Sequence, residues 1–403
     1  MKHVWKLLLV VFGVTLTAYA VFSYSLTDPN LVLISWAPYW QFQQWMWQTF
    51  FINAPLLAQV FTVLIFCLFF VYALLIAKLP KIAISRKTLI VYALLLAPLF
   101  FSYNALSYDV FNYIFNAKMI LVYHVNPYKK MPFEVGNDPW LRFMHNTQSY
   151  APYGYGWTVF SFLPYELGFG KFVPTWLIFR LLSVVSVVLL YFSLQALAEN
   201  MWGRKLNVSE CALLFLNPLF LIEVISDSHN DLWMMAPAIF AFALVIGKKK
   251  NIPKTALSLL LLIFSVSIKF VTGFLFPIWI FFVLQKKFPE NVQSFLSKHW
   301  PTLASVLLFL PLLTDRSQQF NPWYLVWILV WLPFIHNKVW RNTILLFSLS
   351  SLLRYVPWLF NGHFNAQIVM QQKIVTWLPV IFLVVASAIQ IIFRRSQNDI
   401  KAR

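Results

Sequence analysis

Charged side chains are scarce in this chain of 403 residues. Asp, Glu, Lys and Arg together make up 11% of it, whereas soluble domains carry about 25%. Hydrophobic residues make up 60%, and so few charges cannot cover the core that such a composition would need. The scarcity therefore excludes an ordinary soluble domain and indicates that lipid is the solvent for much of the chain.

Cysteine and acidic residues are also few. The two cysteines, Cys67 and Cys211, both lie in apolar runs, which excludes a disulfide framework or a cysteine-based metal site. The 13 acidic residues are outnumbered by 31 Lys and Arg, and the net charge is +18. The basic residues form short clusters between apolar runs, a pattern typical of cytoplasmic membrane loops and not of nucleic-acid binding.

Eleven apolar runs are long enough to cross, or nearly cross, a hydrocarbon layer of ~30 Å. They occupy residues 7–26, 51–77, 88–106, 174–197, 209–226, 232–247, 255–285, 301–314, 324–336, 343–358 and 374–393. The run 255–285 is too long for one helix at about 1.5 Å per residue, so we expect two short helices that bend at Lys269. The fold class predicted is an all-α, polytopic membrane protein with about twelve transmembrane helices.

Lys and Arg set the predicted orientation. Of the 31, 21 fall in the two chain ends and in five alternate loops, namely 78–87, 198–208, 248–254, 286–300 and 337–341. The positive-inside rule then places both termini in the cytoplasm of a multi-pass cell-membrane protein. Residues 1–25 resemble a signal peptide, but an uncleaved first helix is favoured because more spans follow.

The chain is predicted to be one membrane domain with four parts. These are N-terminal spans (1–106), an extracytoplasmic catalytic loop bearing amphipathic helices (107–173), a helical bundle (174–393) and a cytoplasmic tail (394–403). The stretch 156–170 is apolar but short. Were it a span, Lys248–Lys250 would lie outside, so we predict an interfacial or re-entrant helix there.

Acidic residues near lipid are costly and tend to be functional. Asp109 directly follows an apolar run, so it should lie at the outer surface, at the start of an amphipathic helix. One interpretation is a catalytic carboxylate, and the other is an N-cap that satisfies free amides.

A second polar group ends another predicted span. Glu223, Asp227 and Asp231 are spaced i, i+4, i+8 and would share one face of a continuous helix; His229 and Asn230 lie among them. A solvated hairpin tip would also suit these residues, although Glu223 lies within the apolar run and needs a partner. A divalent cation at Asp227 and Asp231 is the weaker alternative, and no other cofactor is predicted.

Cations and aromatic residues accompany these acids at the predicted outer face. Each cation alone could snorkel to lipid headgroups, but together they suggest a bound anion such as phosphate; they are Lys269, Arg180, Arg316 and Arg354. The aromatic residues either form an interfacial belt or stack on sugar rings; they are Tyr128, Tyr153, Trp323 and Tyr324.

Several of these blocks resemble, in order, the motifs of the GT-C superfamily of polyprenol-phosphate-sugar-dependent glycosyltransferases. The nearest group is the bacterial polyprenol-phosphomannose-dependent α-mannosyltransferases. The matching blocks are Asp109–Tyr113, Asn126–Tyr128, Tyr150–Gly154, Asn217-Pro218 with Glu223 and His229–Asp231, Lys269 with Pro277, and Pro322–Tyr324 with Trp327. Tyr155 and the Phe111-Asn112 pair depart from the family pattern.

The resemblance implies an inverting enzyme with Asp109 as the catalytic base. Its donor would be a hexose, with mannose favoured, β-linked to a polyprenyl phosphate, and its acceptor a glycan, glycolipid or glycoprotein. Lys269 and His229–Asp231 would surround the phosphate and sugar, and Tyr153, Trp323 and Tyr324 would form walls. The alternatives are a flippase or transporter of lipid-linked sugars, which would need repeats or midplane charges, and an oligosaccharide polymerase or ligase.

Overall fold

The computed structural model describes residues 4–401 apart from 30, 32, 248–250 and 315–319. The described residues are helical and contain no strand, as the composition predicts. The helices of the first half are α1 (Val4–Ser23), α2 (Ala37–Met46), α3 (Ala54–Lys78), α4 (Arg86–Phe100), α5 (Asp109–Leu121), α6 (Tyr155–Phe160), α7 (Phe162–Leu167) and α8 (Phe172–Trp202).

The second half continues the helical bundle and ends in a long helix. Its helices are α9 (Val208–Phe215), α10 (Pro218–Leu221), α11 (Asp231–Ile246), α12 (Ile252–Ile268), α13 (Phe276–Val283), α14 (Glu290–Phe309), α15 (Val326–Leu329), α16 (Lys338–Leu353), α17 (Val356–Asn361) and α18 (Ala366–Lys401).

Six of these helical segments are long and apolar enough to cross a membrane. A bent pair, Val208–Phe215 with Pro218–Ser226, makes a seventh if it is one broken span, and four shorter apolar helices accompany them. The chain is therefore a membrane protein by the length and composition of its helices. The number twelve stays a prediction, because several of the expected spans form only short helices.

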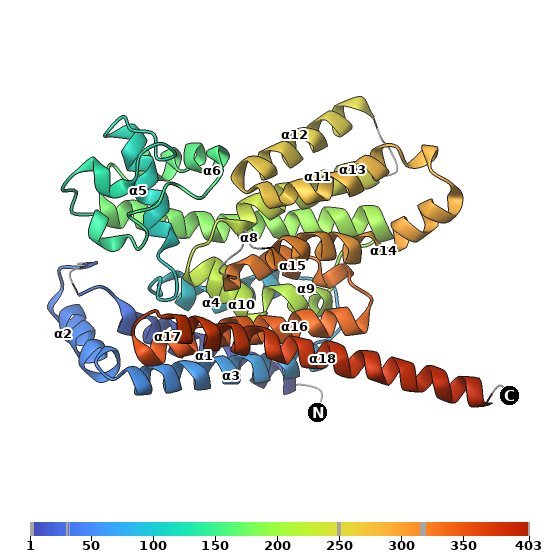
Figure 1. Ribbon diagram of the computed structural model, residues 1–403, viewed down its shortest axis with the longest axis horizontal. Coiled ribbons are helices and arrows are strands. Elements are labelled where there is room, and N and C mark those ends of the chain that lie inside the picture. Colours follow the sequence, from blue (N-terminus) through green and yellow to red (C-terminus); the bar gives the residue numbers. More distant parts are fainter. Residues whose placement is uncertain (1–3, 30, 32, 248–250, 315–319, 402–403) are drawn as a thin grey trace.

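The long helices run roughly parallel in two groups (Figure 1). In one, α11 packs between α8 and α12; in the other, α1 packs on α3 and α16 on α18. The short helices α9, α10 and α15 lie between the groups, while α2, α5, α6 and α17 gather at the left end of the view. The last helix runs away from that end, so the polar motifs around α5 are remote from the C-terminus.

Two predicted apolar runs take a different form for identifiable reasons. The run 88–106 becomes the helix α4, which ends at Phe100, and Arg180 donates hydrogen bonds to the carbonyls of Leu99 and Phe100 that the end of the helix leaves free. The run 255–285 bends at Lys269, whose backbone is extended between α12 and a 3-10 turn. The predicted bend is thus confirmed.

The stretch 156–170 forms two short helices, α6 and α7, rather than one span. The start of α6 is held by Gly154, whose N–H donates to the carbonyl of Ile268 (2.9 Å). A Cβ at this position would lie 2.0 Å from the Ser267 carbonyl oxygen, so only glycine permits the contact. This contact brings the Tyr150–Gly154 turn against the end of α12, next to Lys269.

Candidate active site

Asp109 is the first residue of α5, where the sequence predicts a helix start. The N-cap position is held by Tyr108, so the Asp109 carboxylate is not the N-cap. Its side chain is 15% exposed and faces His229, with 3.6 Å between Oδ2 and Nδ1. The helix itself differs from the expected amphipathic surface helix, because most of its residues are buried on all sides.

An ion pair fastens the loop that follows α5 to the helix. Lys118 Nζ lies 2.5 Å from Asp138 Oδ2 and 3.7 Å from the centre of the Trp140 ring. The Tyr123 hydroxyl also donates to Asp138 (2.5 Å). These contacts hold the loop onto α5 and so hold the helix that carries Asp109 in place.

The second polar group lies on a break in the helix and not on one helical face. A π-helical turn over Ile222–Ser226 ends at Asp227, Ser228 adopts a left-handed conformation (φ 59°), and α11 begins at Asp231. The expected i, i+4, i+8 face is therefore wrong. Such unusual backbone is costly and concentrates at functional sites.

The residues of this break are buried, which excludes the solvated hairpin tip. His229 is 1% exposed, and Asp227 and Asp231 are 0% exposed. The His229 N–H donates to the Glu223 carbonyl (3.1 Å), which folds the break back on itself. The buried imidazole is thereby aimed between two carboxylates.

His229 bridges Asp109 and Glu223. Its Nε2 lies 3.2 Å from Glu223 Oε2, opposite the contact of its Nδ1 with Asp109. The Tyr355 hydroxyl donates to the other oxygen of Glu223 (3.1 Å). Trp323 stacks on the imidazole with 4.1 Å between ring centres, so the ring is held on both its edges and one face.

These contacts determine the charge of the site. Burial opposes protonation of His229, but the adjoining carboxylates of Asp109 and Glu223 raise its pKa to about 9. Burial would raise the pKa of Asp109; His229, the charge of Lys269 and the Tyr153 hydroxyl hold it below its usual value instead. Asp109 is thus an anion and His229 a cation at neutral pH.

A second ion pair joins Lys269 to Asp231, the residue that begins α11. Lys269 Nζ lies 2.7 Å from Asp231 Oδ1, and the Trp327 indole donates to the same oxygen. Tyr324 packs on Trp327 with 4.8 Å between ring centres. The structure therefore brings together the predicted residues Asp231, Lys269 and Tyr324.

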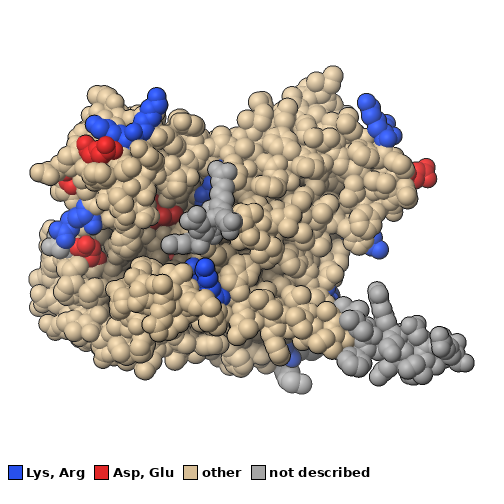
Figure 2. Space-filling view, in the orientation of Figure 1, with Lys and Arg blue, Asp and Glu red and all other residues tan. Residues whose placement is uncertain are grey.

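Asp109 opens into a pocket of about 160 Å³. Figure 2 shows a hollow in the otherwise mostly uncharged surface, with acidic and basic side chains visible inside it. The pocket combines polar groups with aromatic walls. Besides Asp109, its lining includes Asn112, His145, Asn146, Asn321, Trp323, Arg354, Tyr355, Trp358, Phe364 and Gln372.

Several of these lining residues were not singled out from the sequence. Asn112 and His145 lie in the loop region already assigned to catalysis, whereas Trp358 and Gln372 lie in the last seventy residues, where no motif was found. Arg354, in contrast, was among the cations predicted from the sequence, because a cation inside an apolar run is rare.

Of the predicted residues, Asp109, Trp323 and Arg354 line this pocket. Three others have partners elsewhere in the fold. Tyr128 hydrogen-bonds Thr158 (2.5 Å) and lines a different cavity. Arg180 donates hydrogen bonds to carbonyls at the end of α4, including that of Leu99. Asp227 accepts a hydrogen bond from the Leu106 N–H (3.3 Å). Arg316 lies outside the described residues.

Asn230 remains close to the centre of the site. It is 1% exposed, and both polar atoms of its side chain are buried without a partner. Among the residues the structure describes, no group of three His, Cys, Asp or Glu side chains is placed to hold a metal ion. The Asp231 oxygen proposed for a divalent cation already binds Lys269 and Trp327.

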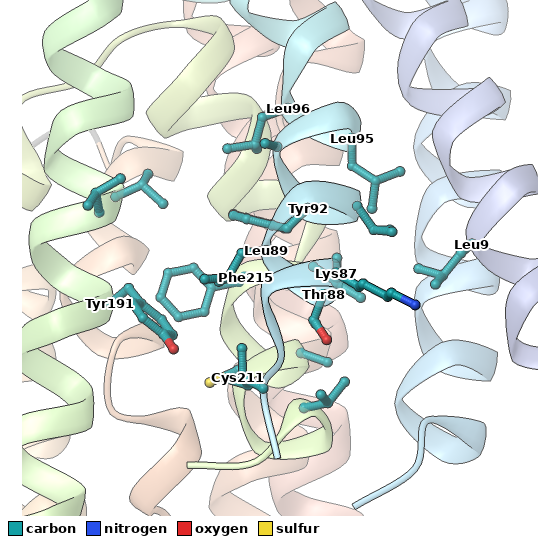
Figure 3. Close-up of a pocket in the computed structure, with 18 of the residues that line it drawn as sticks. Leu9, Lys87, Thr88, Leu89, Tyr92, Leu95, Leu96, Tyr191, Cys211 and Phe215 are labelled. Atoms are coloured by element: carbon teal, nitrogen blue, oxygen red, sulfur yellow. The ribbon is translucent and has the colours of Figure 1, made fainter. Parts of the chain in front are cut away.

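A larger pocket, of about 710 Å³, lies between α4, α8 and α9 (Figure 3). Its labelled lining includes Leu95, Leu96, Tyr191 and Phe215, and the only labelled charged group is Lys87. Binding sites combine apolar walls with a few convergent polar groups. The Asp109 pocket meets that description and this apolar groove does not.

The chain was compared with known families, proteins and structures. A family model described as alpha-(1->6)-mannopyranosyltransferase, N-terminal domain, matches residues 8–285. No curated protein and no solved structure matches the chain. The family match spans more than half of the chain and includes Asp109, Glu223, His229, Asp231 and Lys269. The chain therefore belongs to the alpha-(1->6)-mannopyranosyltransferase family and is a glycosyltransferase that transfers mannose.

Proposed function

We propose that this mannosyltransferase takes mannose from a polyprenyl-phosphate donor and transfers it, with inversion, to a hydroxyl of a glycan, glycolipid or glycoprotein. The observation that carries the proposal is the state of Asp109. Its carboxylate is ionised, is held by His229 and reaches an open pocket. A general base must be ionised and within reach of the proton that it removes.

In this mechanism Asp109 removes the proton of the acceptor hydroxyl. The acceptor oxygen bonds to the anomeric carbon while the bond from that carbon to the phosphate oxygen breaks, and the electron pair leaves with the phosphate. The transition state is oxocarbenium-like, and cations fixed in advance at the site stabilise the leaving phosphate. The Lys269–Asp231 pair and Asn230 supply donors and acceptors for the sugar, and Trp323, Tyr153 and Tyr324 form its walls.

The site is proposed to face the extracytoplasmic side. Support comes from the bias of Lys and Arg, of which 21 of 31 lie in the alternate loops and chain ends assigned to the cytoplasm. The helix α5, which carries Asp109, gathers with α2 and α6 at the end of the bundle from which α18 runs away (Figure 1). A donor held by its lipid tail needs no nucleotide site, because apolar side chains can bind the prenyl chain.

The test is a transfer assay with purified protein and synthetic polyprenyl-phosphate mannose. We expect Asp109→Asn to lower kcat by about 10²–10⁴-fold, with its melting temperature close to that of the wild type. Glu166→Gln changes an exposed carboxylate of α7 in the same region and is the matched control.

The rival functions give different results in the same preparation. A wild type that releases mannose from no phosphate-linked donor, but moves lipid-linked sugars across vesicle membranes, would establish the transporter. Extension of pyrophosphate-linked oligosaccharides alone would establish the polymerase or ligase. An Asp109→Asn variant as active as the wild type would remove Asp109 from the mechanism.

A further inference from the structure

Arg354 is a buried cation on the wall of the Asp109 pocket. It follows α16 directly and precedes α17, and it is 5% exposed. It lies beyond residue 285, where the family match ends. The part of the chain that the family does not describe thus contributes a charge to the candidate active site.

One nitrogen of the Arg354 guanidinium has no hydrogen-bond partner in the described part of the chain. Among the described residues its Nη1 is buried without a partner, and no carboxylate lies within ion-pair distance of its guanidinium. A buried, unpaired charge is costly, so an arrangement of this kind is favourable when an anion occupies the pocket.

Lys269 and Arg180 each have protein partners, and neither of them lines the pocket. Lys269 is paired with Asp231 at 2.7 Å. Arg180 donates hydrogen bonds from all of its nitrogens to protein oxygens. Arg354 is therefore the Lys or Arg side chain that lines the Asp109 pocket, within the described part of the chain, and one of its nitrogens has no protein partner there.

The surroundings of Arg354 suit the phosphate end of a lipid-linked sugar. Gln372 of α18 is buried and lines the same pocket, and its side-chain amide is a donor that a phosphate oxygen can accept from. Trp323 and Trp358 add apolar walls. Asp109 comes from α5 and Arg354 from the α16–α17 corner, so the base and the cation stand on walls built by different elements.

We infer that Arg354 binds the phosphate of the donor. This inference rests on the proposed function and adds which residue receives the leaving group. As the acceptor oxygen bonds to the anomeric carbon, the carbon–oxygen bond to phosphate breaks and its electron pair passes to the phosphate oxygen. The phosphodiester monoanion becomes a monoester with a second negative charge, which the planar guanidinium binds through two N–H groups.

The experiment separates phosphate binding from mannose transfer. Purified protein in detergent is titrated with a short polyprenyl phosphate and with the corresponding polyprenol, and binding is followed by quenching of tryptophan fluorescence. We expect the wild type to prefer the phosphate, and Arg354→Gln to weaken phosphate binding by about 10- to 100-fold without affecting polyprenol. Arg354→Lys should bind with intermediate affinity, because lysine keeps the positive charge but lacks the two parallel N–H groups of the guanidinium.

Two matched variants complete the design. Arg341→Gln removes a cation from α16, 13 residues before Arg354 in the chain, and should bind polyprenyl phosphate as the wild type does. Asp109→Asn should keep the phosphate preference while losing transfer. Melting temperatures verify that each variant is folded.

The outcomes distinguish the two claims. A wild type that prefers phosphate but transfers mannose from no such donor contradicts the proposed function alone. A wild type that does not distinguish phosphate from alcohol, or folded Arg354 variants that bind as the wild type does, overturns the role of Arg354. If Arg354→Gln does not fold, an unchanged affinity in Arg354→Lys overturns it equally.

Discussion

Among the residues that the structure describes, two arginines are buried, and their surroundings differ. Arg180, 1% exposed, donates five hydrogen bonds to Leu99, Phe100, Asn104, Ser226 and the Ser102 hydroxyl. A guanidinium has five N–H donors, so this residue is satisfied within the described chain. Arg354 is also buried, but its Nη1 has no partner.

The comparison teaches that burial of a charge does not by itself identify a ligand site. Arg180 ties the end of α4 to α8 and to the π-helical turn before His229, so it supports the elements that carry the candidate site. Arg354 faces the pocket. Both charges were visible in the sequence. Only the hydrogen-bond partners of each guanidinium in the structure distinguish a structural role from a binding role.

The largest effect on stability should come from Arg180→Met. It leaves the carbonyls of Leu99, Phe100 and Ser226 buried without donors, so we expect a loss of about 3–5 kcal/mol in the free energy of unfolding. Denaturant unfolding in detergent measures it, with Arg354→Met as the counterpart, expected to lose much less. An Arg180→Met protein of normal stability with weak donor binding would return Arg180 to the substrate site.

A smaller effect is expected from Lys269→Met. The change leaves Asp231 buried without its cation and removes a charge that helps to keep Asp109 ionised, so kcat/KM for the donor should fall about 10- to 100-fold. Steady-state kinetics and melting temperature are measured together. Unchanged kinetics would remove Lys269 from the site.

A double variant separates the two consequences of losing Lys269. Adding Asp231→Asn removes the unpaired carboxylate, so the melting temperature should recover toward that of the wild type. Activity should stay low, because the charge near Asp109 is still missing. Recovery of both would mean that the pair stabilises the fold without contributing to transfer.

Local features of the fold were predictable from sequence. The start of α5 at Asp109 and the bend at Lys269 follow from a carboxylate after an apolar run and from a charge that interrupts one. The sequence resemblance also selected side chains that meet in space, including His229 with Asp109. These successes rest on signals carried by a few adjacent residues or by a known order of motifs.

The remaining features depend on contacts between distant segments. Spacing predicted one helical face for Glu223 and Asp231, but the chain breaks between them, with Ser228 in a left-handed conformation. Periodicity assumes a regular backbone and cannot report such a break. Likewise, nothing local indicates that Gln372 lines the same pocket as Asp109, because their meeting there depends on how α18 packs in the fold.

The smallest expected effect concerns the pH dependence of the reaction, which depends on the buried His229. The folded-state pKa of His229, about 9, lies above the ordinary value of 6.5, so the imidazolium is present through neutral pH and is lost as pH rises through about 9. Deprotonation removes the cation between Asp109 and Glu223. We therefore expect kcat/KM to fall as pH rises through about 9. The stability that these ion pairs contribute is full below the ordinary pKa of 6.5, declines above it and is lost once pH has risen through about 9.

Glu223→Gln tests the origin of this alkaline limb. The variant removes one of the two carboxylates that raise the His229 pKa, so the limb should move to lower pH by about one unit. Glu199→Gln, at an exposed position near the far end of α8, should leave it in place. The rate is measured from pH 6 to about pH 10 with saturating acceptor. If the alkaline limb of the rate profile is unchanged in Glu223→Gln but absent in His229→Gln, Asp109 alone stabilises the imidazolium. Glu223 would then have a structural role, as the acceptor of the Tyr355 hydrogen bond.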